Sequence, residues 1–198
     1  MAKLDIRTAI LDAGLKLFHQ NGYHATGVQD IARAAGVPKG SFYHYFDSKE
    51  ALGAEAVERY GASGTRRLVL ADRAIAPQQR LRDYFCGLSD NFSGNDFIHG
   101  CLLGNLSAEL GDSSPLIRER LAAVYRIWTD AIAGAIRDGK ADGSIASAHA
   151  PDDLAVLLLD AWAGAVLRAR VAKDRQALDV FLELGLEMAL AGPTAASI

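Results

Sequence analysis

Two helix-breaking signals lie close together near the start of this 198-residue chain, and they limit what its first quarter can form. The first is Asn21-Gly22, which follows an amphipathic helical pattern, and the second is Gly36-Val-Pro38. Glycine commonly ends a helix and proline suits only the first turn of one, so the helices that follow Gly22 are about two turns long. Helices this short are unstable alone. The sequence therefore predicts three N-terminal helices that stabilise one another by packing.

The composition favours helices throughout the chain. Half of the residues are hydrophobic, alanine and leucine dominate, and strand-like runs of Val, Ile and Thr are scarce. This is enough apolar surface for a substantial core, and we expect an all-α protein. The first apolar residues alternate with charged ones, and the longest apolar run, residues 154–167, is too short to cross a bilayer. We therefore expect a cytoplasmic protein with no membrane partner.

Charge and cysteine usage narrow the functional classes. Cys86 and Cys101 are too few for a disulfide scaffold and lack zinc-site spacing, so we expect no metal and no cofactor. The net charge is −3, yet residues 1–49 carry six Lys/Arg against four Asp/Glu. The more basic N-terminal segment indicates that this part of the chain meets an anion.

The first three predicted helices have distinct start signals and buried faces. The first covers residues 6–21 and has an apolar stripe. The second begins at Thr26, which forms a capping-box pattern with Gln29. The third covers residues 38–46 and begins with the proline. On a helical wheel, Phe42, Tyr45 and Phe46 fall on one side of this third helix and lock it onto the others.

The opposite face of the third helix is small, polar and basic. Gly40 lies at its centre and lets the backbone approach a partner closely. Two short helices joined by a glycine turn, the second with such a face, form a helix-turn-helix that places its second helix in the DNA major groove. A helical hairpin that never binds DNA is the alternative. Thr26 and Lys49 favour DNA, because they lie at predicted helix starts, where backbone amides attract phosphate.

The stretch ILDAGLKLFHQNGYHATGVQDIARAAGVPKGSFYHYFDSKEAL resembles the DNA-binding domain of the TetR family of bacterial transcriptional regulators. The shared pattern is G-x-x-x-T-x-x-x-x-I-A-x-x-A-G-V-x-x-G-x-x-Y-x-x-F-x-x-K-x-x-L. The resemblance implies a ligand-responsive regulator, usually a repressor, that binds a palindromic DNA operator as a homodimer and releases it on binding or reacting with a small molecule. It implies phosphate contacts from Thr26, Tyr43 and Lys49, a base-facing surface of Lys39, Gly40, Ser41 and His44, and apolar groove contacts from Val37 and Pro38.

The same resemblance implies two domains. Residues 1–50 would form the helix-turn-helix domain and residues 51–198 a helical domain for ligand binding and dimerisation. A long fourth helix, from Ser48 towards Asp72, is expected to connect them. Five further helices are predicted, and they cover residues 77–92, 100–110, 115–137, 151–173 and 175–191.

The predicted helix over residues 151–173 is apolar on nearly all sides and must be covered on nearly all sides. In a protein of this size the second cover is most simply another subunit, so this helix and the last one are expected to form a four-helix dimer interface. A central helix within a monomer core is the alternative. The expected interface residues are Leu154, Leu158, Ala161, Ala165, Phe181, Leu184 and Met188.

The segment HGCLLGNLSAELGD, residues 99–112, resembles one found in a TetR branch whose repressors respond to reactive electrophiles such as N-ethylmaleimide and acrylate. Cys101 is predicted in the first turn of a helix, where free N–H groups would lower the pKa of its thiol, with His99 adding positive charge. It is the expected sensor thiol, and an inert buried thiol is the alternative. Other expected effector-pocket residues are Tyr84, Asn105, Tyr125, Trp128 and Trp162, for which core packing is the alternative.

Two other functions compete with DNA binding. A helical enzyme would use Cys101 as nucleophile and His99 as base, but residues two apart point in different directions and no orienting third group is evident, so we expect no catalytic residues. A protein-binding adaptor would need exposed apolar anchors on the third helix, whereas Lys39, Ser41 and His44 suit phosphates and base edges better.

Overall fold

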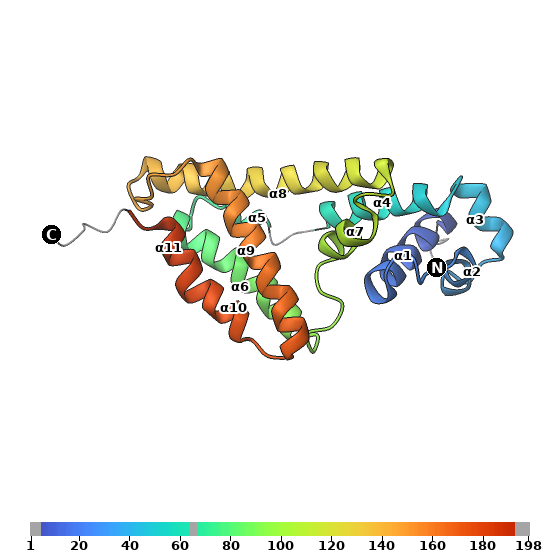
Figure 1. Ribbon diagram of the computed structural model, residues 1–198. Coiled ribbons are helices and arrows are strands. Elements are labelled where there is room, and N and C mark those ends of the chain that lie inside the picture. Colours follow the sequence, from blue (N-terminus) through green and yellow to red (C-terminus); the bar gives the residue numbers. More distant parts are fainter. Residues whose placement is uncertain (1–4, 64–66, 193–198) are drawn as a thin grey trace. The chain divides into compact units, whose positions relative to one another are not determined.

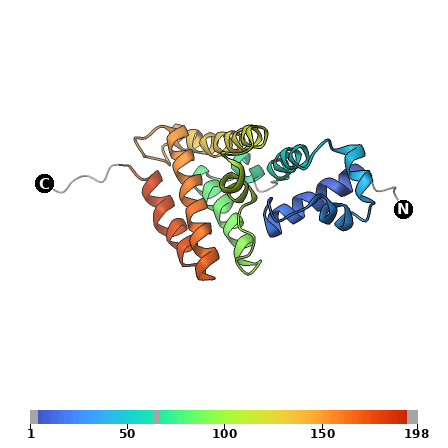
Figure 2. The same ribbon diagram turned by 45° about the vertical axis from the view of Figure 1, so that its right-hand side comes forward.

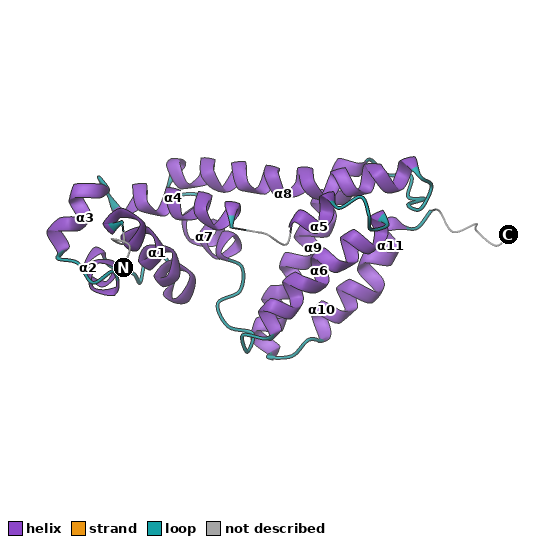
Figure 3. Ribbon diagram, turned by 180° about the vertical axis from the view of Figure 1, so that it is seen from behind, coloured by secondary structure: helices purple, strands orange, loops and turns teal. Residues whose placement is uncertain are grey.

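The computed structural model describes residues 5–63 and 67–192, and within these ranges the chain forms helices and no strand (Figure 3). The all-α prediction is confirmed. None of the helices in the described ranges has the length and apolar character needed to cross a membrane. The chain divides into two compact units, one of residues 5–63 and 99–124 and one of residues 67–98 and 125–192.

The first unit contains the N-terminal helices, which are labelled in Figure 1. They are α1 (Ile6–Asn21), α2 (Val28–Ala34), α3 (Lys39–Tyr45) and α4 (Lys49–Ala62), joined by α7 (Leu102–Leu110) and the first part of α8 (Pro115–Ala141). Helix α1 ends where Gly22 adopts a φ of +86°, as the Asn21-Gly22 signal predicts. The three N-terminal helices are confirmed, and α1 contacts both α2 and α4.

Helix α3 is held by its aromatic face. It has only seven residues, and the Phe42 side chain is completely buried while Phe46, which follows the helix, is 3% exposed. The two rings lie 5.8 Å apart. Burial of two phenylalanines contributes about 1.5–3 kcal/mol each, which offsets the poor intrinsic stability of so short a helix. The predicted packing of Phe42 and Phe46 is confirmed, and Tyr45 is half-buried.

Two predictions of helix ends are wrong. Helix α2 is capped at Gly27, whose N–H donates to the Asp30 carboxylate at 3.2 Å, and not by a box of Thr26 and Gln29. The fourth helix ends at Ala62 and does not continue to Asp72; residues 64–66 of the predicted helix lie outside the described ranges, and a separate short helix α5 covers Leu68–Ala71. Ser63 and Gly64, which follow Ala62 in the sequence, are weaker helix formers than alanine.

The compact first unit extends beyond the predicted 1–50 domain. Helix α4 is joined to α1 by an ion pair between Arg7 and Glu55, 2.6 Å apart. The segment that starts α8 returns to α4, where the Ser114 hydroxyl donates to the Glu50 carboxylate. The helix-turn-helix thus folds as one body with α4 and with a segment that is distant in sequence.

The second unit contains the remaining helices. They are α5, α6 (Pro77–Ser93), the second part of α8, α9 (Pro151–Ala172), α10 (Gln176–Val180), a π-helical turn η2 (Phe181–Gly185) and α11 (Leu186–Leu190). The last three form one continuous helical segment, which confirms the predicted final helix. Helix α9 contacts both α6 and this final segment, and the three lie side by side in both views (Figure 1, Figure 2).

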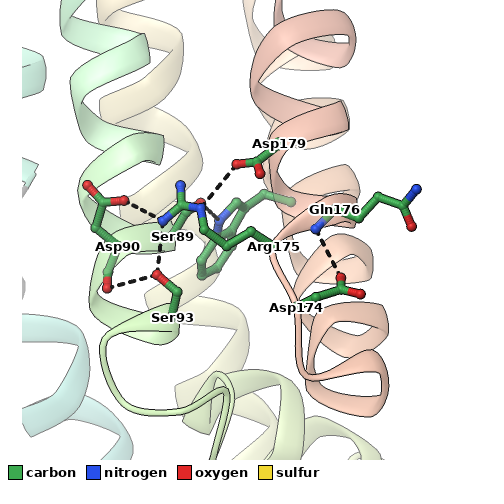
Figure 4. Close-up of polar contacts among 8 residues, drawn as sticks. Ser89, Asp90, Ser93, Asp174, Arg175, Gln176 and Asp179 are labelled. Atoms are coloured by element: carbon green, nitrogen blue, oxygen red, sulfur yellow. Dashed lines mark hydrogen bonds and ion pairs between the residues drawn. The ribbon is translucent and has the colours of Figure 1, made fainter.

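A polar network fixes the turn between α9 and α10 (Figure 4). The Arg175 guanidinium donates to the carboxylate of Asp90 at 2.7 Å and to the hydroxyl of Ser93 at 2.9 Å, both at the end of α6. It also donates to Asp179 on α10 at 3.1 Å. Deeper in the unit, the Trp162 indole N–H on α9 donates to the hydroxyl of Ser89 on α6 at 3.1 Å. The Arg175 bonds join the α9–α10 turn to the end of α6, and the Trp162 bond joins α9 to α6 directly.

The predicted dimer residues divide into two groups by burial. Leu154, Leu158, Ala165 and Phe181 are buried within the subunit itself, so their assignment to the dimer interface is wrong. Phe181, for example, packs its ring 5.0 Å from that of Phe85 on α6. Ala161, Leu184 and Met188 are exposed. Large apolar side chains are also exposed nearby on α9 and α10, namely Val156, Leu157, Leu167, Val171 and Val180.

Helix α8 offers a paired test of packing. A Cβ on Gly139 would lie 2.7 Å from Cγ1 of Ile145 and 3.1 Å from Cβ of Pro77, whereas a Cβ on Gly134 would meet nothing within 4 Å. We expect Gly139→Ala to lower the free energy of unfolding by about 1–3 kcal/mol through overpacking. We expect Gly134→Ala to raise it by about 0.5–1 kcal/mol through reduced chain entropy. Urea denaturation of both variants measures these changes, and equal effects would contradict the packing around Gly139.

Candidate nucleic-acid interface

The outward face of α3 brings together most of the residues predicted to contact DNA. Lys39, Gly40, Tyr43 and His44 are exposed, with 54% of Tyr43 accessible. No atom would lie within 4 Å of a Cβ on Gly40. The face thus offers an ammonium group, a hydroxyl and an imidazole around a flat backbone surface, which are groups that bond to base edges and phosphates in a major groove.

The remaining predicted groove residues lie on the rim of this face. Pro38 occupies the N-cap position of α3 and is exposed, while Val37 and Ser41 are half-buried. Val37 and Pro38 belong to the turn between α2 and α3 and come directly before Lys39 and Gly40.

Thr26 does not have the exposure that a phosphate contact requires. Its side chain is 1% exposed. The hydroxyl donates to the Gly22 carbonyl at 2.8 Å and lies 3.3 Å from that of Leu17. The expected hydroxyl–phosphate contact is therefore wrong: the side chain closes the turn after α1 from inside.

Lys49 also points inward. Its ammonium group donates to the carbonyls of Tyr23 at 3.2 Å and Thr26 at 3.1 Å, and lies 4.1 Å from the centroid of the Tyr23 ring. Burial lowers the pKa of Lys49, and the negative charge of Glu109 acts in the opposite direction. The Lys49 ammonium group, predicted to bind phosphate, binds the carbonyl side of the turn before α2, and its phosphate contact stays a prediction.

Glu109 on α7 binds the amide side of the same turn, and the sequence analysis missed it. Its carboxylate accepts hydrogen bonds from the backbone N–H groups of Tyr23 at 3.2 Å and His24 at 3.0 Å. A lone glutamate near the end of a predicted helix is an unremarkable surface residue, and its partners are backbone groups 86 and 85 residues away. No local sequence signal could have identified this contact.

Cys101 occupies the N-cap position immediately before α7, and not the first turn. It is half-buried. Burial raises the pKa of the Cys101 thiol above its ordinary value, although hydrogen bonds from the N–H groups of Gly104 and Leu103 and from the Tyr60 hydroxyl act in the opposite direction. The predicted lowering of this pKa is therefore wrong, because burial outweighs the helix terminus.

Two histidines lie beside the start of α7. His19 on α1 forms a hydrogen bond through Nε2 with the Gly100 carbonyl at 2.8 Å, and its ring centroid is 5.6 Å from that of His99. His99 has a φ of +69°, which is uncommon for a residue other than glycine. The Asn105 amide donates to the His99 carbonyl at 2.6 Å. Within the described ranges, no group of three or more His, Cys, Asp and Glu side chains is arranged to hold a metal ion.

The other predicted effector residues belong to the second unit. Tyr84, Trp128 and Trp162 are buried and Tyr125 is half-buried. The Trp162 hydrogen bond to Ser89 suits the packing alternative for that residue. Cys86, also in this unit, has its thiol pKa raised by burial and by the charge of Asp90. The predicted pocket residues therefore form two sets, one in each unit.

The sequence matches two family models, one for the N-terminal helices and one for the later part of the chain. Residues 10–56 match the family model described as bacterial regulatory proteins, tetR family. Residues 77–184 match the tetracyclin repressor-like C-terminal domain. The chain is 36% identical over 192 residues to the HTH-type transcriptional repressor DhaR of Mycobacterium sp. strain GP1, covering 96% of this chain and 95% of that protein.

A second sequence relative and a solved structure are also similar to this chain. The transcriptional regulator AcuR of Cereibacter sphaeroides is 37% identical over 165 residues, which cover 82% of this chain and 75% of AcuR. The crystal structure of Escherichia coli NemR in its reduced form matches with a TM-score of 0.84 at 31% identity, covering 96% of this chain and all of that one. The chain therefore belongs to the TetR family of bacterial regulatory proteins, and it is a DNA-binding transcriptional regulator with a helix-turn-helix head and a helical C-terminal domain.

Proposed function

We propose that this protein is a ligand-responsive repressor that binds a palindromic operator as a homodimer and releases it when a small-molecule effector binds or reacts. The observation that carries the proposal is the exposed face of α3, where Lys39, Gly40, Tyr43 and His44 lie together. A transcriptional regulator meets its operator where bacterial DNA lies, so the proposed place of action is the bacterial cytoplasm. Neither a cysteine–histidine enzyme nor a protein-binding adaptor forms part of this proposal.

The α3 face supports a division between base readout and phosphate binding. Lys39, Ser41 and His44 are proposed to read base edges, since ammonium, hydroxyl and imidazole groups bond to purine acceptors. Tyr43 is proposed to donate its exposed hydroxyl to a phosphate, while Val37 and Pro38 supply apolar contact in the groove. The proposed DNA surface excludes Thr26, which bonds inside the head.

Variants at Lys39, His44 and Tyr43 test this division. We expect Lys39→Ala and His44→Ala to change the preference among operator bases by about 1–3 kcal/mol per lost contact, and Tyr43→Phe to weaken binding to all sequences alike. Fluorescence anisotropy would be measured on a duplex selected from a random library and on its single-base variants. Lys16→Ala removes an exposed charge from α1 and is the matched control. If Lys16→Ala and Lys39→Ala shifted the base preference equally, α3 would not be the helix that reads the operator bases.

The exposed apolar face of α9 and the final helical segment supports the proposed homodimer. Leu167 and Val171 on α9 are 61% and 86% exposed, and Leu184 and Met188 lie on the final segment at 54% and 69%. Exposed apolar side chains of this size on neighbouring helices are typical of protein interfaces. Two copies of this face would pair as a four-helix bundle.

Charge placed on this face should prevent dimerisation. We expect Leu167→Glu with Val171→Glu to give a monomer, because two carboxylates would be buried without partners in each subunit of the dimer. Light scattering coupled to gel filtration measures the mass. Ile127→Glu changes a residue on α8 that is 53% exposed and serves as the control. A dimeric double variant, or a monomeric control, would contradict this interface.

Cys101 is proposed as the sensor thiol, with reactivity limited by its environment. This proposal is supported by the position of Cys101 directly before α7. The last turn of α7 bonds to the turn before α2 through Glu109. Because burial raises the thiol pKa, the thiolate is a small fraction at neutral pH and the resting protein reacts slowly. An effector must therefore be strongly electrophilic or must first bind nearby.

The pH dependence of alkylation tests the state of this thiol. In a Cys86→Ser variant we expect the iodoacetamide rate at Cys101 to rise about tenfold per pH unit from about pH 6.5 to 8.5 without levelling off, since the thiolate fraction grows with pH until the pKa is reached. A plateau below about pH 8 would contradict the raised pKa. Operator release by a soft electrophile that persists in Cys101→Ser would remove the sensor role.

A further inference from the structure

The turn between α1 and α2 has its backbone bonded on two sides by charged side chains from other helices. Glu109 on α7 accepts from the N–H groups of Tyr23 and His24, and Lys49 on α4 donates to the carbonyls of Tyr23 and Thr26. Hydrogen bonds to charged groups are stronger than those between neutral groups. The turn that leads into the helix-turn-helix is therefore positioned by α4 and α7 together.

The approach of Glu109 to this turn is close. A Cβ on Gly22 would lie 2.7 Å from a Glu109 carboxylate oxygen, and Gly22 has a φ of +86°. Any other residue at position 22 would be strained and would also push the carboxylate away. The contact between this turn and the Glu109 carboxylate therefore requires glycine at position 22.

The position of Glu109 is unfavourable for α7 itself. The residue lies in the last turn of a nine-residue helix, where the helix dipole disfavours a negative charge. The interaction that stabilises the Glu109 carboxylate therefore comes from outside α7, namely the hydrogen bonds from the two N–H groups of the turn before α2. A residue that opposes a local rule while satisfying a distant one is a candidate for function.

The other end of α7 is bonded to the same region of α1. The Gly100 carbonyl, just before Cys101, bonds to His19, which lies in the last turn of α1. Helix α7 is about 13 Å long at 1.5 Å per residue. Its N-terminal end is bonded to α1 and its C-terminal end to the turn that follows α1, so α7 joins these two places as one rigid element. A shift or rotation of α7 cannot leave both attachments unchanged.

We propose that Glu109 is a positioning residue for DNA binding, which transmits the position of α7 to the turn before α2 and so sets the orientation of the helix-turn-helix. The proposal rests on the proposed DNA-binding function and adds the route by which a change near Cys101 alters operator affinity. Glu109 holds the turn in the DNA-binding arrangement. A displaced α7 withdraws the carboxylate, leaves the N–H groups of Tyr23 and His24 to water, and frees α2 to move with the recognition helix.

The first test compares specific and non-specific binding in the full-length protein. We expect Glu109→Ala to weaken binding to the selected operator about tenfold and binding to a random duplex less than about twofold, because orientation affects base readout more than phosphate contact. Glu109→Gln, which keeps an uncharged acceptor, should fall between wild type and Glu109→Ala. Glu119→Ala removes an exposed carboxylate from α8 in the same unit and should change neither affinity. Equal loss on both duplexes, or no loss, would overturn the proposal.

The second test requires no operator. Hydrogen exchange of the peptide covering residues 22–27 should be faster in Glu109→Ala than in Glu119→Ala. Carboxamidomethylation of Cys101 by iodoacetamide, in a Cys86→Ser background, should speed exchange of this peptide when Glu109 is present and add nothing in Glu109→Ala. If carboxamidomethylation and Glu109→Ala had additive effects on the exchange rate of this peptide, or if neither changed it, α7 would not transmit changes at Cys101 to the turn through Glu109. A wild-type protein that selects no duplex but shows this exchange pattern would instead contradict the proposed function.

Discussion

The burial of Phe42 is the contact on which the DNA-binding surface depends. Helix α3 has seven residues and does not form by itself, so its direction is set by the side that faces the core. Phe46 adds a second anchor, and the Arg7 guanidinium lies 4.9 Å from the centroid of its ring. The polar face of α3 is therefore fixed indirectly: Tyr43 and His44 point outward because their neighbour in sequence points inward.

Contacts that follow from local periodicity could be predicted, and contacts between distant backbone groups could not. Gly22 and the Phe42–Phe46 pair were readable because a helix end and a helical face leave a short-range pattern. Thr26 was misassigned, and the carbonyl partners of Lys49 were not foreseen, because both residue types suit phosphate and backbone carbonyls equally well. Only the fold shows which partner lies within reach.

The errors at Cys101 and on α9 have different physical causes. At Cys101 two opposing effects compete, and the sequence shows the helix start but not the burial that prevails. On α9 the helical period was correct but the direction was not, since a helix with apolar residues all round does not reveal which stripe its own subunit covers. Leu158 is buried while Leu157, one position earlier, is 55% exposed.

The discontinuous first unit has a consequence for folding. Residues 99–124 join α1 and α4 only after an intervening segment of the second unit has been synthesised. The bonds made by Gly100, Glu109 and Ser114 are all of long sequence separation, and such contacts form late because loop closure must come first. The first unit is therefore incomplete until residues 99–124 have been synthesised.

The π-helical turn at Phe181–Gly185 sets the direction in which the final helical segment presents its side chains. A π-helical turn closes its hydrogen bonds from residue i to i+5 and so holds one more residue than an α-helical turn. Removing one residue here would turn α10 by about 100° relative to α11 and take Val180 out of line with Leu184 and Met188. The length of this segment, and not only its residue types, therefore decides which apolar side chains share its exposed face.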